Sequence, residues 1–192
     1  MTTEALTSSR ISLDELTGTY NIDPSHSRFG FVARHAMVTK VRGSFTDFEG
    51  TLTVDAEDPA RSSGQLTIQA KSINTRNEDR DGHLRSNDFF AMDEYPQITF
   101  QSTRVESTDD DSVYRVTGEL DIRGVSKPVT FDVEFTGAAI DPWGSTRIGL
   151  EGSTTVNRKE WGINWNAALE AGGVLVSEKV TIEFEIAAVK AN

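Results

Sequence analysis

Histidine is the side chain best suited to proton transfer near neutral pH, and the chain contains three: His26, His35 and His83. No two of them lie three or four residues apart, so a zinc site would need carboxylates from distant segments. His35 falls within an apolar, strand-like stretch, where a hydrogen-bonded core histidine is the ordinary interpretation. The histidines alone therefore predict neither a catalytic residue nor a metal site.

Other signatures of catalysis are missing from the sequence. Cysteine is absent, which excludes disulfides, thiolate catalysis and cysteine-ligated metals. There is no Gly-x-Ser-x-Gly elbow, no phosphate-binding glycine loop and no dinucleotide fingerprint. Carboxylates are so numerous that no pair stands out as acid and base. We therefore predict that the protein is not an enzyme and has no catalytic cofactor.

The acidic segment 77–88 has the spacing of a calcium-binding EF-hand loop, with Gly82 at its sixth position. It departs from that motif at both ends, because Asn77 stands at the first position and Asp88 replaces the bidentate glutamate at the last. The residues before it resemble a strand rather than an entering helix. We therefore predict a charged loop with a short helix within residues 77–90, and no metal.

Two aromatic groups could either contact a ligand or fill the end of a barrel. Trp161 and Trp165 would share one face of an extended strand, because side chains alternate there with a period of two. Phe89 and Phe90 follow the polar segment directly, where they could attach a helix to a sheet or form a lid.

From Gly18 onward, hydrophobic residues alternate with a period of two, which is typical of half-buried strands. The stretch 29–40 looks like one long strand, and its apolar face contains Phe29, Phe31, Ala33, His35 and Met37. Similar alternation occurs around residues 52–54, 66–68, 98–100, 116–122, 129–135, 148–150 and 180–186.

Short polar turns, rather than long helices, separate these runs. The pattern therefore predicts an all-β, antiparallel fold of about eight strands. Long strands with one apolar face close most economically into a barrel, which can hold one small ligand. A sandwich with a filled core fits the pattern nearly as well.

The charge balance restricts the partners. The chain has 192 residues, with 19 Lys and Arg against 30 Asp and Glu and a net charge of −11. This charge excludes nucleic acid as an expected partner and disfavours docking on anionic membranes. If the protein collects ligand from such membranes, added salt should speed transfer by screening the repulsion.

The N-terminal residues and the hydropathy of the chain indicate the cellular compartment of the protein. Residues 1–17 lack the basic and apolar regions of a secretory signal, and we predict a flexible or loosely packed leader there. No run approaches the ~18–20 apolar residues of a membrane span. We therefore expect a cytoplasmic protein with one domain at residues 18–192.

Nine short motifs occur in order within residues 18–189. They are Tyr20-Asn-Ile-Asp-Pro-Ser-His-Ser27 with Phe31-x-x-x-His35, Gly43-x-Phe45-x-x-Phe48-x-Gly50, Ser72-Ile-Asn-Thr75-Arg-Asn77, Arg80-Asp-Gly-His-Leu-Arg-Ser86, Asp88-Phe-Phe90, Tyr95-Pro-Gln-Ile-Thr-Phe100-x-Ser102, Gly118-x-Leu120-x-Ile-Arg-Gly124, Pro128-Val129 and Arg158-x-x-x-Gly162-Ile163. In this order, the motifs resemble the YceI-like family of bacterial polyisoprenoid-binding proteins, which have a lipocalin-like fold.

The resemblance implies an extended antiparallel barrel with a short helix after the fourth strand region. Its apolar tunnel would hold a polyprenyl lipid or similar amphiphile, such as an isoprenoid quinone, for transport, storage or sequestration. Binding such a chain requires only apolar burial, at roughly 25 cal/mol per Å². Trp161 stands where relatives often carry Phe, which could shorten or reshape the tunnel.

We predict that the ligand contacts a set of mostly apolar residues: Phe29, Phe31, Ala33, His35, Met37, Phe45, Leu66, Ile68, His83, Leu84, Phe89, Phe90, Phe100, Trp161 and Trp165. His35 would be the polar contact inside the tunnel. Segment 83–90 would form the mouth, with Arg80, His83 or Arg85 near a headgroup.

Two alternatives stay open from the sequence. One is a barrel enzyme that acts on a small apolar substrate with His35 and an internal carboxylate. The other is a stress-related structural protein with a filled core and no cargo. Transient membrane contact and an edge-to-edge homodimer are both compatible with a strand-rich ligand carrier.

Overall fold

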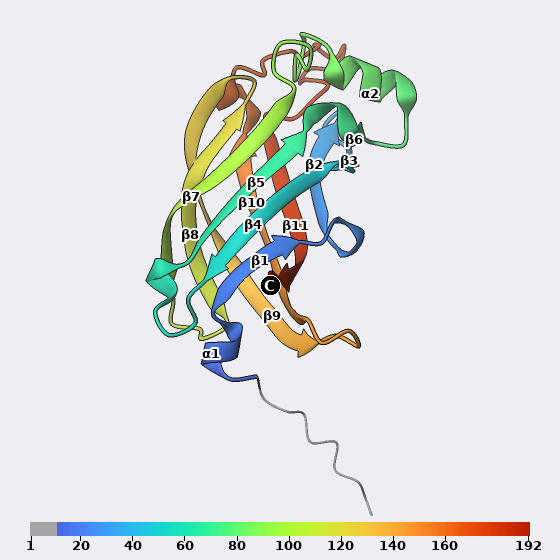
Figure 1. Ribbon diagram of the computed structural model, residues 1–192. Coiled ribbons are helices and arrows are strands. Elements are labelled where there is room, and N and C mark those ends of the chain that lie inside the picture. Colours follow the sequence, from blue (N-terminus) through green and yellow to red (C-terminus); the bar gives the residue numbers. More distant parts are fainter. Residues whose placement is uncertain (1–10) are drawn as a thin grey trace, which may run out of the picture.

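The computed structural model describes residues 11–192 and confirms the predicted antiparallel β-barrel (Figure 1). Eight strands follow one another around the barrel in the order β1-β4-β5-β7-β8-β9-β10-β11, and β11 pairs back with β1 to close it. Their bounds are β1 Gly18–Ile22, β4 Phe48–Val54, β5 Ser63–Gln69, β7 Gln97–Ser107, β8 Val113–Ile122, β9 Val125–Ile140, β10 Thr146–Asn157 and β11 Lys179–Lys190.

Three further strands extend the sheet at one end of the barrel. β2 (Arg28–His35) continues along β11 beyond β1, after the short 3₁₀ helix Pro24–His26. β3 (Thr39–Phe45) forms a hairpin with β2, and the two-residue β6 (Ile73–Asn74) pairs with β3.

Two α-helices lie at opposite ends of the barrel (Figure 1). α1 (Leu13–Leu16) begins with a capping box between Ser12 and Glu15, in which each side chain bonds the other residue's backbone N–H. α2 (Glu78–Arg85) begins at Asn77, whose side chain accepts a hydrogen bond from the Arg80 N–H. α2 confirms the short helix predicted within residues 77–90.

Three more 3₁₀ helices occur in the connections, at Pro59–Arg61, Ala70–Ser72 and Arg158–Trp161. Among residues 11–192, no helix is long and apolar enough to cross a membrane.

The alternating residues of the long strands point into the barrel as their periodicity predicted. In β9, Val129, Phe131, Val133 and Phe135 face the interior, whereas the intervening Thr130, Asp132 and Glu134 are exposed. Because the inward side is apolar on all eight strands, closing the sheet removes these side chains from water together.

The stretch 29–40 is not one long strand, and this prediction was wrong. The chain turns back at residues 36–38, so that β2 and β3 pair as a hairpin with His35 opposite Thr39. Ala36 and Met37 adopt the left-handed backbone conformation, with φ of 51° and 61°. No Gly, Asn or Pro marks this turn, and the continuous apolar pattern therefore concealed it.

Candidate ligand-binding cavity

A continuous cavity of about 600 Å³ runs through the barrel. Leu13 and Leu16 of α1 line one end of it, and Leu84 of α2 lines the other. The volume lies within the range of small-molecule sites, which is about 300–1,000 Å³. The interior is therefore a ligand-sized space along the barrel axis, not the filled core of a sandwich.

Phenylalanine dominates the wall. Nine of the ten phenylalanines of the chain line the cavity, and the tenth, Phe48, packs edge-on against Phe29 with ring centroids 4.8 Å apart. Phe131 links Phe100 and Phe184 across the interior, at centroid distances of 5.5 Å to each. Such edge and tilted contacts fix the rings while leaving their apolar surfaces toward the cavity.

Two inward glycines make room for these rings. A Cβ on Gly118 would overlap the Phe100 ring and approach the Gln101 carbonyl oxygen to 2.6 Å. A Cβ on Gly152 would lie 2.6 Å from the Phe184 ring and 2.7 Å from the Asp132 carbonyl oxygen. The outer edge of each ring therefore lies against a glycine of the neighbouring strand, where a larger residue would displace it.

Aromatic side chains close the α2 end. Phe90 lines the cavity and meets Phe45 edge-on at 6.0 Å. Phe89 also lines the cavity, and His83 and Trp165 pack behind it at 5.0 and 5.5 Å. The His83 Nε2 atom lies 2.8 Å from a carboxylate oxygen of Asp88, which holds the imidazole on this outer layer.

Arg158 is the only cationic side chain of the described residues that lines the cavity. It is buried, and its guanidinium donates hydrogen bonds to the carbonyl oxygens of Ile163, Val176 and Ser177 at 2.7, 3.3 and 2.8 Å. Burial lowers the pKa of Arg158, and the nearby Glu178 carboxylate opposes that shift. Arg158 thus ties the connection 162–178 to the end of the barrel while leaving a positive charge beside the cavity.

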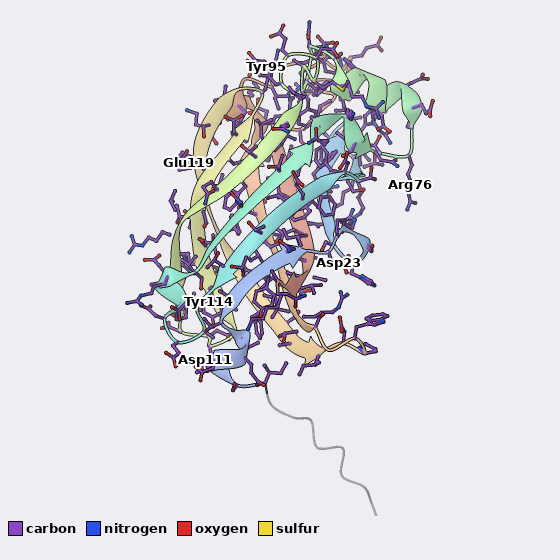
Figure 2. The ribbon with its side chains drawn as sticks, viewed as in Figure 1. Asp23, Arg76, Tyr95, Asp111, Tyr114 and Glu119 are labelled. Carbon is purple, nitrogen blue, oxygen red and sulfur yellow. The ribbon has the colours of Figure 1, made fainter. Side chains whose placement is uncertain are left out.

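The α1 end is more polar. Asp55 and Asp111 lie in the connections that follow β4 and β7, and both border the cavity there, as does Tyr114. Figure 2 places Asp111 and Tyr114 beside α1, at the end opposite Tyr95. A headgroup at this end would meet carboxylates, whereas at the α2 end it would meet Arg158.

Eleven of the fifteen predicted contact residues line the cavity: Phe29, Phe31, Ala33, Phe45, Leu66, Ile68, Leu84, Phe89, Phe90, Phe100 and Trp161. Whether they contact a ligand stays a prediction. The other four, His35, Met37, His83 and Trp165, do not line it.

The four exceptions have structural reasons. His35 and Met37 lie at the end of the β2–β3 hairpin and are exposed, because the chain turns there. Trp161 ends a 3₁₀ helix and Trp165 follows it in a loop, so the two do not share a strand face. His83 belongs to the outer layer with Trp165, at a centroid distance of 4.5 Å.

Arg80 and Arg85, expected near a headgroup, also lie outside the cavity wall. Arg80 donates to the side chain and carbonyl of Thr75, and Arg85 donates to the carbonyls of Lys71 and Ile73. Both arginines therefore hold α2 against the barrel.

Several residues of the cavity wall were not predicted as ligand contacts, although they lie in runs with the same alternation of apolar residues. The inward residues of β9 and β11 were visible as alternating runs, and they include Phe131, Phe135, Ile182, Phe184 and Ile186. Leu13 and Leu16 had no such signal, because one short helical turn shows no periodicity. Residues 1–10 of the predicted leader lie outside the described residues.

A polar cluster braces the outside of the barrel away from the cavity. The Arg147 guanidinium bonds the carboxylates of Asp23 and Asp141 at 2.8 and 2.9 Å. The bond to Arg147, with a smaller contribution from His26, lowers the pKa of Asp23 to about 2. Within residues 11–192, no group of three or more His, Asp or Glu side chains is placed to hold a metal ion.

A closed antiparallel barrel around a continuous apolar cavity is a lipocalin-like architecture. The chain belongs to the YceI-like domain family, whose model matches residues 20–188. This match confirms the resemblance seen in the ordered motifs.

Known relatives agree with this assignment. A UPF0312 protein of Staphylococcus aureus strain USA300 is 41% identical over 165 residues, which cover 85% of this chain and 93% of that protein. BcnA of Burkholderia cenocepacia has the same fold, with a TM-score of 0.76 and 23% identity over 86% of this chain and 98% of its own. A polyisoprenoid binding domain from Saccharophagus degradans matches with a TM-score of 0.69 and 17% identity, covering 90% of this chain and 98% of that domain.

Proposed function

We propose that this protein binds a long-chain isoprenoid or similar amphiphile, such as an isoprenoid quinone, inside the barrel and carries, stores or sequesters it. The observation that carries the proposal is the cavity, which runs from α1 to α2 and is lined by nine phenylalanines. An apolar chain in this space would be removed from water along its whole length, at roughly 25 cal/mol per Å².

One protein of the same fold supports this class of ligand. The Saccharophagus degradans domain with this fold is named as polyisoprenoid binding. None of the three histidines of the chain lines the cavity, so the alternative of a barrel enzyme built on His35 gains no support. A cytoplasmic location stays a prediction.

The test begins with solvent extraction of the purified protein and mass spectrometry of the extract, with native mass spectrometry alongside. We expect one amphiphile per chain, with homologues spaced by isoprene units. If the extract is empty, the protein is titrated with an isoprenoid quinone, and the intrinsic tryptophan fluorescence, to which Trp161 in the cavity wall contributes, is followed. An empty extract together with no uptake would contradict the proposal.

A pair of variants ties the ligand to the cavity. Phe31 lines the cavity, whereas the next residue of β2, Val32, does not. We expect Phe31→Glu to lose bound lipid, because a carboxylate in the apolar cavity is not solvated. Val32→Glu, on the other face of the strand, should retain it. A folded Phe31→Glu protein with full ligand content would contradict the assignment.

A further inference from the structure

The β2–β3 hairpin differs in charge from the rest of the chain. Residues 28–46 contain four basic residues, Arg28, Arg34, Lys40 and Arg42, and no Asp or Glu, although the protein has a net charge of −11. Arg28 and Arg42 both lie near Glu183 of β11, at 3.9 and 3.7 Å.

Near the end of the hairpin the positive charge is not balanced. Arg34 and Lys40 are direct cross-strand partners, and neither forms an ion pair in the described part of the chain. Like charges directly opposite each other destabilise a sheet. The adjoining loop 166–176 contains one acidic residue, Glu170. An anionic partner would relieve this repulsion.

The turn itself holds apolar side chains in water. Met37 and Val38 are 64% and 72% exposed. The Val38 N–H closes the turn on the His35 carbonyl at 3.0 Å, with Ala36 and Met37 in the left-handed conformation that residues with a Cβ rarely adopt. Costly backbone conformations of this kind gather at functional sites.

A neighbouring loop enlarges the apolar surface. A Cβ on Gly173 would overlap the Met37 sulfur, so this loop packs directly against the turn. Val174, the next residue, is 37% exposed. We call Met37, Val38 and Val174 the apolar tip.

The apolar tip lies next to the α2 end of the cavity. His35 forms a bridge with Val176, which lines the cavity, and the Ala36 N–H donates to the Leu175 carbonyl at 2.7 Å. Two residues before His35, Ala33 also lines the cavity. Figure 1 shows β2 ending on the α2 side of the barrel.

Negative charge is more concentrated at the opposite end than at the α2 end, where residues 76–96 and 158–178 contain nine acidic and five basic residues. Acidic residues crowd α1 and the connections after β4, β7 and β9: Asp14, Glu15, Asp55, Glu57, Asp58, Asp109, Asp110, Asp111 and Asp141. An anionic surface would repel this end and turn the β2–β3 hairpin toward itself.

We propose that the apolar tip docks the α2 end of the barrel on an anionic phospholipid bilayer. Met37 and Val38 enter the interface, while Arg34 and Lys40 lie at the level of the phosphates. Docking would place the cavity end against the membrane from which a ligand is drawn. Its role in ligand exchange rests on the proposed function, but bilayer binding itself does not.

The test is sedimentation of the protein with vesicles of equal parts phosphatidylglycerol and phosphatidylcholine, compared with phosphatidylcholine alone. We expect tighter binding to the anionic vesicles. Arg34→Gln with Lys40→Gln should weaken that binding about 25-fold, because each basic residue at an anionic surface contributes about fivefold. Met37→Asn with Val38→Thr, which suits the left-handed turn, should weaken it about tenfold.

Matched variants at the other end serve as controls. Ile140 and Trp143 are 54% and 82% exposed in the β9–β10 hairpin, so Ile140→Thr with Trp143→Asn removes as much exposed apolar surface there. Arg61→Gln with Arg104→Gln removes two exposed charges far from the tip. All four variants should remain folded, which thermal melting checks, and both controls should bind vesicles normally.

Salt distinguishes this proposal from the expectation based on net charge. Raising NaCl from about 50 mM to about 0.5 M should release the protein from anionic vesicles, whereas general repulsion would make binding rise. Three results would each overturn the proposal. They are binding to phosphatidylcholine vesicles as tight as to the anionic vesicles, loss of binding only in the Ile140→Thr, Trp143→Asn control, and no binding to any vesicle. The amount of bound ligand, measured by extraction of the same variants, should not change. A protein that binds the vesicles but contains no ligand and takes none up would contradict only the proposed function.

Discussion

The indole Nε1 of Trp161 donates a hydrogen bond of 2.9 Å to the main-chain carbonyl of Leu120, at the α2 end of the cavity. Trp161 is 1% exposed and lines the cavity, so its ring both fixes η4 (Arg158–Trp161) on β8 and limits the space for a ligand. The two roles make separate measurements possible.

Trp161→Phe should destabilise the protein by about 1–3 kcal/mol, because it removes this hydrogen bond and leaves a small void. The variant should also accept ligands with a longer chain. Chemical denaturation and extraction followed by mass spectrometry measure the two effects. Trp143→Phe, at an exposed position, should change neither; equal behaviour of the two variants would show that Trp161 does not limit the cavity.

Two glycines give a second prediction, because replacing them by alanine should change the stability of the protein in opposite directions. Gly118→Ala should cost about 1–3 kcal/mol, since the new Cβ would push the Phe100 ring away from the wall. The displaced ring should also reduce the amount of bound ligand. Gly82→Ala, within α2 and with nothing within 4 Å of the added Cβ, should instead stabilise the protein by about 1 kcal/mol or less. A Gly118→Ala protein with full stability and full ligand content would contradict this account of the wall.

The barrel and most of its wall could be predicted from the sequence, because apolar residues at every second position of a strand all point to the same, buried face of the sheet. Phe131 and Phe184 show this: each faces the cavity and each alternates with exposed or half-exposed polar residues. The short helix could be predicted because residues 77–90 lack that period and begin with a good N-cap.

Other features could not be predicted, for two physical reasons. The turn at Ala36 and Met37 is held by tertiary packing on loop 166–176 rather than by turn-forming residues. The direction of Trp165 depends on its contact with His83, which is distant in sequence. Patterns along the chain do not record such contacts.

Arg158 gives a third prediction. Its guanidinium donates hydrogen bonds to three carbonyl oxygens of the connection 162–178. The ammonium of a lysine cannot reproduce this planar set of donors. Arg158→Lys should therefore destabilise the protein by about 2–4 kcal/mol although it keeps the charge. Lys159→Arg, on the exposed side of the same turn, should be neutral within about 0.5 kcal/mol. Thermal and chemical denaturation measure both, and full stability of Arg158→Lys would show that charge alone suffices.

The Asp23–Arg147 pair predicts how stability depends on pH. The pKa of Asp23 in the folded protein is about 2, below the 3.8 of a free side chain, chiefly because of its bond to Arg147. This pair therefore stabilises the fold fully above about pH 4, and the contribution disappears as the pH falls toward about 2. With screening at a partly exposed site, about 1–2 kcal/mol is involved.

Asp23→Asn should accordingly be less stable than the wild type at pH 6, and the difference should close at about pH 2. Asp109→Asn, in the β7–β8 connection, is the control and should be neutral at pH 6. Urea denaturation at several pH values measures the difference. A difference between Asp23→Asn and wild type that does not vary with pH would show that the carboxylate acts through packing instead.

Leu16 of α1 gives the last prediction, which concerns the other end of the cavity. α1 is held by two bonds from the barrel: the Tyr20 hydroxyl donates to the Leu16 carbonyl at 2.7 Å, and the Lys190 ammonium donates to the Glu15 carbonyl at 2.6 Å. The Leu16 side chain lines this end of the cavity.

Leu16→Ser should therefore speed ligand release about tenfold, because less apolar surface seals the end. Asp14→Ser, on the same helix but outside the cavity wall, should release ligand like the wild type. Release is followed by transfer of a fluorescent prenyl probe to excess acceptor vesicles; equal rates for both variants would mean that ligand leaves only through the α2 end.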